Sequence, residues 1–308
     1  MMIHGSLVAL VTPFRNNEID EVALRNMVRW HIEQGTHGLV PTGTTGESPT
    51  LSAEEHCRVV EIVVDEAGGR VPVVAGAGSN NPVEAIRFSI HAQNCGADAA
   101  LHVAGYYVRP NQEGLFQHFK AVHDATDLPI IVYNIPPRAI VDILPATMAR
   151  IAALPRVVGV KDATGDLNRP MLESLAIERE SIDGEFSFLS GEDGTAVAYN
   201  ASGGRGCISV TANVAPAMCA EMQTACLNGD FVSAMKIQKA LMPLHAALFA
   251  EPSPAGAKYA ASLLGLCAAD CRLPITELTD NTKSRIREAM SKLKLLDSAS
   301  TMESDIAV

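Results

Sequence analysis

The stretch Val157-Val158-Gly159-Val160-Lys161-Asp162-Ala163 is a short apolar run with a lysine near its end. Valine is enriched in strands, and a short apolar run of this length is consistent with a fully buried strand. Strands that are apolar on both faces are typical of parallel sheets, because helices cover both sides of such a sheet. The stretch therefore predicts one strand of a parallel α/β sheet.

Similar runs recur along the chain and alternate with amphipathic stretches of helical pattern, which is typical of repeated βα units. Eight such runs are present, over residues 6–14, 37–43, 71–77, 99–105, 129–135, 157–163, 186–191 and 206–213. Eight parallel strands with interleaved helices close most economically into a barrel. We therefore predict an α/β fold, a (β/α)8 TIM barrel with a C-terminal helical extension; an open doubly wound sheet is the alternative.

Residues that cap helices stand between the apolar runs. Asp20 is expected to begin the first helix, and Ser52 with Glu55 has the spacing of a capping box at the second. Asn81-Pro82 is expected to begin the third helix, and Gly96 to end it. These signals support helices in the places that a βα repeat requires.

The chain changes character after the eighth run, because every remaining pattern is helical. Breaks rich in Gly and Pro indicate three or four helices in this part. We predict three parts: a barrel core over residues 1–214, the eighth barrel helix plus the C-terminal helical extension over residues 215–298, and a disordered tail over residues 299–308.

Composition and charge narrow the possible partners. Hydrophobic residues make up 47% of the chain and charged residues 19%, which is typical of a globular protein. The formal net charge of −11 argues against a nucleic-acid or anionic-membrane partner, because both require a basic surface. Residues 1–14 resemble neither a signal peptide nor a membrane span, so we expect a cytoplasmic location.

The seven cysteines show no Cys-x-x-Cys spacing, so they indicate neither a disulfide framework nor a zinc site. We interpret them as small buried apolar residues. Cys207 lies in an apolar run, where a nucleophilic role is conceivable, but no His/Asn pattern that would activate it is readable in the sequence.

Lys161 stands out because only two lysines, Lys120 and Lys161, occur in the first 235 residues. Lys120 lies on an amphipathic segment, where a solvated side chain is expected. Lys161 ends an apolar strand, so its side chain either extends outward to solvent or is desolvated. Desolvation turns an amine into a nucleophile for carbonyl groups, and active sites of barrels lie at the carboxyl ends of the strands.

Polar residues follow three other runs at the corresponding end. The turn Gly43-Thr44-Thr45-Gly46-Glu47 offers hydroxyls and backbone N–H groups that suit a carboxylate. Tyr133, at the end of the fifth run, is a candidate proton relay, and Arg138 shortly after it is a candidate for carboxylate binding. The pair Tyr106-Tyr107 follows the fourth run. Each could also be an ordinary turn, core or surface residue. Their common position at strand ends favours one site.

The chain resembles the dihydrodipicolinate synthase / N-acetylneuraminate lyase family over about residues 5–296. The motifs that carry the resemblance are Gly43-Thr44-Thr45-Gly46-Glu47, Tyr106-Tyr107 with Arg109-Pro110, Tyr133-Asn134-Ile135-Pro136 with Arg138, and Lys161-Asp162-Ala163-Thr164-Gly165. Among the activities of such a family, the resemblance implies condensation of pyruvate with aspartate semialdehyde in lysine and diaminopimelate biosynthesis. It implies small-molecule substrates, neither metal nor organic cofactor, and a homotetramer arranged as a dimer of dimers.

The resemblance assigns four residues to catalysis. Lys161 would form an imine with pyruvate, and Tyr133 would move protons during imine formation and carbon–carbon bond formation. Thr44 would link Tyr133 to Tyr107, and the latter would reach across a dimer interface from the neighbouring subunit.

Four further residues would bind the substrates. Thr45 would hold the pyruvate carboxylate and Arg138 the carboxylate of the aldehyde, while Gly191 and the carbonyl group of Ile208 would line the floor of the site.

The resemblance also implies a feedback site for lysine at the dimer interface. Its expected residues are Ser48, His56, Asn80, Glu84 and Tyr106. Pro49 and Ala53 depart from the pattern that is common in lysine-sensitive members, so the sequence leaves regulation open.

The residues Ala139-Ile140 after Arg138, together with Val108, also depart from the family pattern. They motivate one alternative to the condensation, a pyruvate-dependent aldolase or dehydratase that acts on a sugar acid or another 2-keto acid. A second alternative, which does not depend on these residues, is a catalytically silent barrel that binds a small keto acid.

Overall fold

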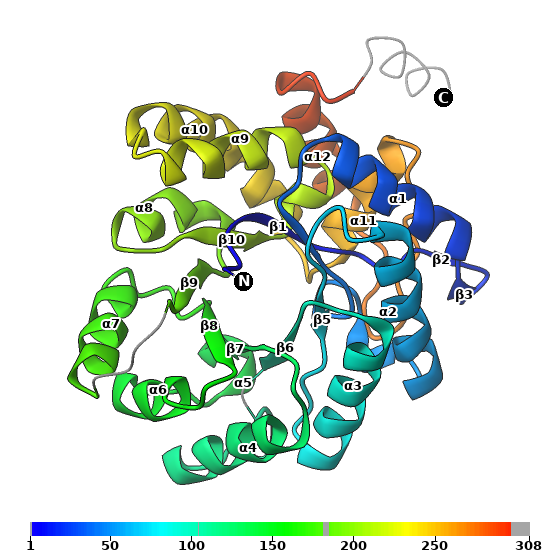
Figure 1. Ribbon diagram of the computed structural model, residues 1–308. Helices are drawn as coiled ribbons and strands as arrows, with labels where there is room; N and C mark the ends of the chain where they lie inside the picture. The colour runs from blue at the N-terminus through cyan, green and yellow to red at the C-terminus, as the bar shows by residue number, and fades with distance from the viewer. Residues whose placement is uncertain (1, 104, 181–184, 297–308) are drawn as a thin grey trace, which may run out of the picture.

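The computed structural model describes residues 2–103, 105–180 and 185–296, which form a parallel barrel surrounded by helices (Figure 1). The strands follow one another in the order β4-β1-β10-β9-β8-β7-β6-β5, and a parallel bridge between Leu39 and Val73 joins the two ends. The predicted (β/α)8 barrel is thus confirmed, and the open-sheet alternative is wrong. The strands are β1 Gly5–Ala9, β4 Gly38–Val40, β5 Val74–Gly76, β6 Ala99–Val103, β7 Ile130–Asn134, β8 Val157–Asp162, β9 Ser187–Ser190 and β10 Gly206–Ser209.

Helices follow the strands and cover the outside of the barrel. The predicted caps are confirmed, since Asp20 accepts from the Ala23 N–H, Ser52 and Glu55 form a capping box, and Asn81 accepts from the Val83 N–H. The covering helices are α1 Glu21–Glu33, α2 Ala53–Ala67, α3 Pro82–Cys95, α4 Gln112–Ala125, α5 Pro136–Ala139, α6 Pro145–Ala152, α7 Arg169–Arg179, α8 Ala196–Ala201 and α9 Pro216–Leu227. Three one-turn 3-10 helices, η1 Ser48–Thr50, η2 Asp193–Thr195 and η3 Thr211–Asn213, lie in loops.

The strands are shorter than the apolar runs that predicted them. The run over residues 6–14 contains β1 and then a buried loop that ends in a small hairpin of β2, Phe14–Arg15, and β3, Glu18–Ile19. Leu10 and Val11 are buried without belonging to a strand, because they pack against the helices outside the barrel. The apolar run is therefore longer than the strand, because it includes buried residues that make no strand hydrogen bonds.

The inside of the barrel is filled by apolar side chains of alternate strand residues. Leu7, Ile131, Leu189 and Ile208 belong to one buried cluster, and Tyr133 completes it toward the carboxyl ends of the strands. Side chains on the opposite faces of the same strands, such as Val160, pack against the outer helices. The barrel is a packed core, and open space is left only where the strands end.

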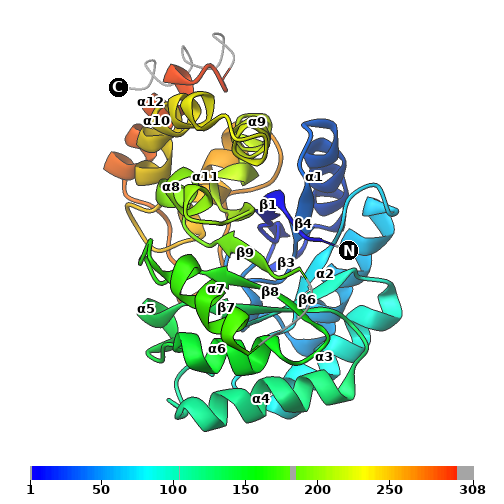
Figure 2. The same ribbon diagram turned by 60° about the vertical axis from the view of Figure 1, so that its left-hand side comes forward.

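Three helices form the C-terminal extension: α10 Phe231–Leu248, α11 Ala255–Leu263 and α12 Asp280–Lys292. They pack with α9 on one side of the barrel, away from α4 (Figures 1 and 2). The division of the chain into three parts stays a prediction, and the expected tail, residues 299–308, lies outside the described residues. Among the described residues, no helix is long and apolar enough to cross a membrane.

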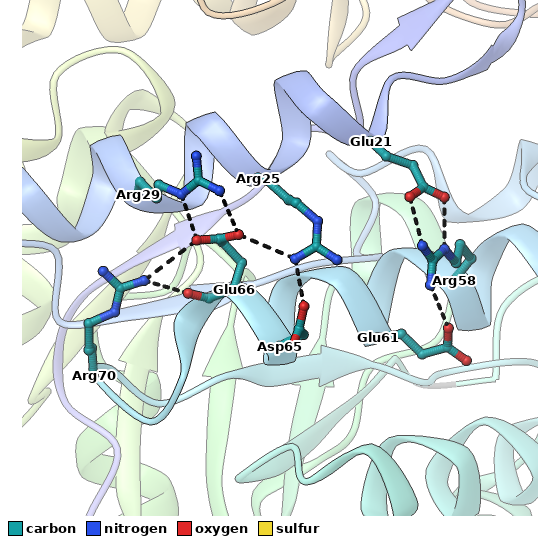
Figure 3. A network of polar contacts seen from close by, with 8 residues as sticks. All are labelled: Glu21, Arg25, Arg29, Arg58, Glu61, Asp65, Glu66 and Arg70. Atoms are coloured by element: carbon teal, nitrogen blue, oxygen red, sulfur yellow. Dashed lines mark hydrogen bonds and ion pairs between the residues drawn. The ribbon is translucent and has the colours of Figure 1, made fainter.

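Ion pairs join α1 to α2 on the outer surface (Figure 3). Glu66 accepts from Arg25 and Arg29 of α1, and Arg58 of α2 pairs with Glu21 of α1 and with Glu61. Pairs this exposed contribute little to stability one by one, because water screens them. They fix the relative placement of the two helices at their outer edges.

A buried acidic cluster lies between β8 and α7. Glu173 of α7 is fully buried, and neither of its carboxylate oxygens has a hydrogen-bond partner among the described residues. Burial, together with the negative charge of Asp162, raises the pKa of Glu173 to about 8, and the nearby Arg169 only partly opposes this effect. Asp142 also faces the group and is itself paired with Arg169, whose Nη2 lies 2.7 Å from its Oδ2. Glu173 is therefore expected to be protonated at neutral pH.

The raised pKa predicts how stability depends on pH. Between pH 4.5 and 8 the folded chain keeps the proton of Glu173, whereas the unfolded chain releases it. The contribution of Glu173 to the free energy of unfolding is therefore fully present below pH 4.5 and is lost as the pH rises through 8. Glu173→Gln removes the ionisation and should raise stability at pH 8.5 relative to the native chain, by at most roughly 5 kcal/mol at about 1.4 kcal/mol for each pKa unit. Thermal unfolding at pH 5 and pH 8.5 measures it. Equal effects of the substitution at both pH values would contradict the expectation.

Candidate active site

Lys161 and Tyr133 face each other inside the barrel at the carboxyl ends of two adjacent strands. The parallel register of β7 and β8 pairs Tyr133 directly with Lys161. The Lys161 Nζ lies 4.3 Å from the centre of the Tyr133 ring, and both side chains are 7% exposed. Lys161 is thus buried and does not extend outward to solvent. Lys120, in contrast, forms an ion pair with Asp124 on the surface of α4, as expected.

A cavity of about 250 Å³ opens beside Tyr133, and Lys161 reaches it only through its contact with the Tyr133 ring, because it is not among the lining residues. Three residues predicted for the site, Thr44, Tyr133 and Arg138, line it together. The remaining lining residues are Thr42, Gly43, Ser48, Pro49, Gly76, Gly78, Leu101, Val103, Tyr106, Ile135 and Ala139. The cavity therefore lies where β4, β5, β6 and β7 end, which is the functional end of such a barrel.

The turn after β4 is wound tightly against the barrel. The Glu47 N–H donates to the Thr44 carbonyl at 3.1 Å, and the Thr12 hydroxyl donates to the Gly46 carbonyl at 2.7 Å. A Cβ on Gly46 would lie 3.0 Å from the Leu10 carbonyl oxygen, so only glycine allows this close approach. As a result Thr44 is exposed toward the cavity, while Thr45 is buried below it.

Gly191 leaves room for the Lys161 side chain. A Cβ at this position would lie 3.1 Å from the Lys161 Cε and 2.9 Å from the Ala163 Cβ. The Gly191 N–H donates to the Asp162 carbonyl at 2.6 Å, so the backbone of Gly191 is held against the end of β8. The predicted residue Gly191 therefore does lie beside the amine.

Ile208 lies in β10, with its side chain buried in the barrel interior. The segment that follows is held by Asp193, whose Oδ2 accepts from the Val210 N–H at 2.9 Å and from the Thr211 N–H at 3.1 Å. Sequence reasoning named Asp193 only as a possible start of a short helix and did not assign it to the site. A buried carboxylate with this role has no local signature, because its partners follow it by more than fifteen residues.

Tyr107 does not contribute to the cavity of its own chain. Its side chain is 90% exposed, and its φ of 67° is in the left-handed region, which is uncommon for a tyrosine. Tyr106, in contrast, lines the cavity. The loop therefore directs one tyrosine inward and presents the other to the outside.

Two of the five residues predicted for regulation line the cavity, and the other three do not. Ser48 and Tyr106 line the cavity, and the Asn80 Nδ2 donates to the Tyr106 carbonyl at 3.4 Å. Glu84 accepts from the Ser79 hydroxyl at 2.6 Å. His56 is buried and stacks on Phe88 with ring centres 3.9 Å apart, and burial lowers the pKa of His56 to about 4. At neutral pH it therefore offers a neutral imidazole.

Sequence reasoning missed several residues of the cavity wall, among them Gly76 and Val103. Both stand at the ends of apolar runs that were predicted to be strands. A Cβ on Gly76 would lie 2.3 Å from the Thr42 carbonyl oxygen, so this glycine allows β5 to approach the turn after β4. Inspection of every strand end, not only of polar ones, would have found these residues.

Comparisons with known proteins agree with the geometry. The family model described as the dihydrodipicolinate synthetase family matches residues 2–293. The 4-hydroxy-tetrahydrodipicolinate synthase of Parvibaculum lavamentivorans is 58% identical over 296 residues, which is 96% of this chain and 100% of that protein.

Solved structures agree as well. The dihydrodipicolinate synthase of Aquifex aeolicus is similar with a TM-score of 0.91 at 41% identity, covering 95% of this chain and 99% of that one. The DHDPS of Cyanidioschyzon merolae, solved with lysine bound, is similar with a TM-score of 0.90 at 32% identity, covering 95% of this chain and 99% of that one. The chain therefore belongs to the dihydrodipicolinate synthetase family.

Proposed function

We propose that this chain condenses pyruvate with L-aspartate 4-semialdehyde to 4-hydroxy-tetrahydrodipicolinate, the activity for which its relatives are named. The product enters lysine and diaminopimelate biosynthesis. The observation that carries the proposal is a buried lysine, Lys161, in contact with Tyr133, which itself lines a cavity together with Thr44 and Arg138. An amine in this place is suited to form an imine with a small keto acid.

The reaction begins at Lys161. The neutral Nζ attacks the keto carbon of pyruvate, water leaves, and a protonated imine forms. Loss of a proton from the pyruvate methyl group then gives an enamine, because the imine nitrogen accepts the electron pair. Tyr133, in contact with Lys161, is placed to carry these protons, and Thr44 on the same cavity connects it toward a second tyrosine.

Carbon–carbon bond formation follows. The enamine carbon attacks the aldehyde, and the amine of the second substrate then closes the ring by displacing Lys161 from the imine carbon. Arg138 on the cavity wall suits the carboxylate of this second substrate, since a guanidinium can bind it with two parallel hydrogen bonds. Thr45, Gly191 and Ile208 complete the pyruvate side below Tyr133.

We propose that the active enzyme is at least a dimer. The 90% exposure of Tyr107 supports this proposal, because a second subunit would both cover the tyrosine and receive it beside Thr44. A second apolar surface supports the homotetramer, since Met171, Leu172 and Leu175 on α7 are 54%, 47% and 44% exposed. A cytoplasmic location also stays a prediction, in keeping with a biosynthetic role.

Covalent trapping tests the imine. Borohydride added with pyruvate should increase the mass of the chain by one reduced pyruvate imine, on the peptide that contains Lys161. Lys161→Arg keeps the charge but should not be trapped. The native chain should also convert pyruvate and aspartate semialdehyde to the ring-closed product. A folded native chain that is not trapped would refute every imine mechanism, whereas trapping without ring closure would favour another aldehyde or keto acid.

Feedback by lysine is proposed as well. Glu84 and Asn80 are near the cavity edge and could bind the ammonium groups, while Ser48 and Tyr106 could bind the carboxylate. Initial rates should therefore fall as lysine rises into the millimolar range. Glu84→Gln removes one charge that would face an ammonium group, so it should shift half-inhibition to at least about tenfold higher lysine. Initial rates that stay constant to millimolar lysine would contradict this regulation.

A further inference from the structure

Glu47, the last residue of the turn that carries Thr44 and Thr45, is held by the C-terminal extension. Its backbone has a φ of 56°, in the left-handed region, and its side chain is 2% exposed. The carboxylate therefore points into the protein, away from the cavity that the turn borders. A buried carboxylate requires a partner, because its desolvation is costly.

The partners of this carboxylate come from residues more than two hundred positions later. The Lys258 Nζ of α11 lies 2.7 Å from the Glu47 Oε1, and Lys258 is completely buried. The backbone N–H of Arg272 donates to the Glu47 Oε2 at 2.8 Å. The Phe14 ring lies against both cations, 4.1 Å from the Lys258 Nζ and 4.3 Å from the Arg272 guanidinium carbon.

This arrangement is directional, because both carboxylate oxygens of Glu47 have a defined partner. An apolar pair of similar size would stabilise the contact as well, because two charges lose their hydration on burial. A charge pair gains little in stability but defines where both partners lie. The Glu47 N–H also donates to the Thr44 carbonyl at 3.1 Å, so the side chain and the turn are one rigid unit.

We propose that Glu47 and Lys258 are positioning residues, through which the C-terminal extension sets the geometry of the turn that binds the pyruvate carboxylate. Neither side chain touches the substrate. The identity of the bound carboxylate rests on the proposed function. The coupling between α11 and the turn does not. The C-terminal extension thus acts on the active site although none of its residues lines the cavity.

Two variants separate positioning from stability. Lys258→Met leaves a buried carboxylate without its cation, so it should lower thermal stability and raise the KM for pyruvate by at least tenfold. The double variant Glu47→Gln with Lys258→Met contains no unpaired charge and should regain most of the thermal stability. Its KM for pyruvate should stay raised, and borohydride trapping should need correspondingly more pyruvate, while kcat at saturation changes less.

Ile286→Ala is the matched control. Ile286 is completely buried on α12 and belongs to the cluster between the barrel helices and the extension. The substitution should lower thermal stability while the KM for pyruvate stays unchanged. A double variant with native KM, or a control whose KM rises as much as that of Lys258→Met, would overturn the positioning role.

Hydrogen exchange keeps this test independent of the proposed reaction. Amides of residues 43–48 should exchange faster in Lys258→Met than in Ile286→Ala, without any substrate. Unchanged exchange would overturn the inference even if pyruvate is trapped. If the native chain does not trap pyruvate but the exchange differs, the coupling stands and the proposed reaction fails.

A second, independent inference concerns a group of ligand-type side chains between α2 and α3. The His91 Nε2 of α3 lies 3.3 Å from the Cys95 Sγ and 3.5 Å from the Glu61 Oε1 of α2. The three ligand atoms lie within 4.8 Å of one another. The other oxygen of Glu61 pairs with Arg58 at 3.2 Å (Figure 3), which leaves Oε1 free to face His91.

The two separations from the His91 Nε2, 3.3 and 3.5 Å, are close to those between neighbouring ligands of a tetrahedral zinc ion. Bonds of about 2.0–2.3 Å at a tetrahedral angle place neighbouring ligand atoms roughly 3.3–3.6 Å apart. We infer that Glu61, His91 and Cys95 bind a divalent cation of the zinc class. Cys57 precedes Glu61 by one helical turn, and its backbone carbonyl oxygen also lies 3.3 Å from the His91 Nε2. A cation here would clamp the C-terminal halves of α2 and α3 together.

Cobalt(II) titration of the reduced full chain tests this site. One equivalent should produce the charge-transfer absorbance of a thiolate-bound cobalt ion, and zinc(II) should abolish it. His91→Ala and Cys95→Ser should weaken binding at least tenfold, whereas Cys271→Ser, a partly buried cysteine outside the group, should not. Absence of the absorbance, or equal absorbance in Cys95→Ser, would overturn the inference.

Discussion

The pairing of β7 with β8 is the constraint on which the site depends. Parallel register places Tyr133 opposite Lys161, and the alternation of the strands directs both side chains into the barrel. A slip of one residue would turn Lys161 toward the outer helices and bring Asp162 inside. The apolar cluster below the pair resists such a slip, because it would expose or misplace Ile131 and Leu189.

Ionisable side chains are buried on both faces of β8: Lys161 inside the barrel, and Asp162 beside Glu173 outside it. Inside the barrel, the Lys161 Nζ lies 4.3 Å from the centre of the Tyr133 ring, and the ring covers it. Outside, Arg169 pairs with Asp142, and burial together with the charge of Asp162 raises the pKa of Glu173 so that it holds a proton. The strand therefore places Lys161 in an apolar interior and Asp162 in an acidic exterior.

The fold and the location of the site could be predicted from sequence because their signals are local. Apolar runs, the capping box at Ser52 and the Asn81 cap each involve residues within a few positions of one another. Lys161 was singled out because a lysine in an apolar strand is conspicuous. Three features were not predicted: the ends of the strands, the hairpin of β2 and β3, and the cavity wall at Gly76 and Val103. They depend on which residues pack against an apolar run, and the run itself does not show this.

By itself, then, the sequence determined the order of the elements, their closure into a barrel and the residues at the strand ends. Only the tertiary structure decided which distant side chains meet: Lys258 with Glu47, Glu61 with His91, and Glu173 with Asp162. The physical reason is that hydrogen bonding along a helix or strand is periodic and readable locally. Contacts between elements depend on barrel register and on helix packing, which no single stretch of sequence encodes.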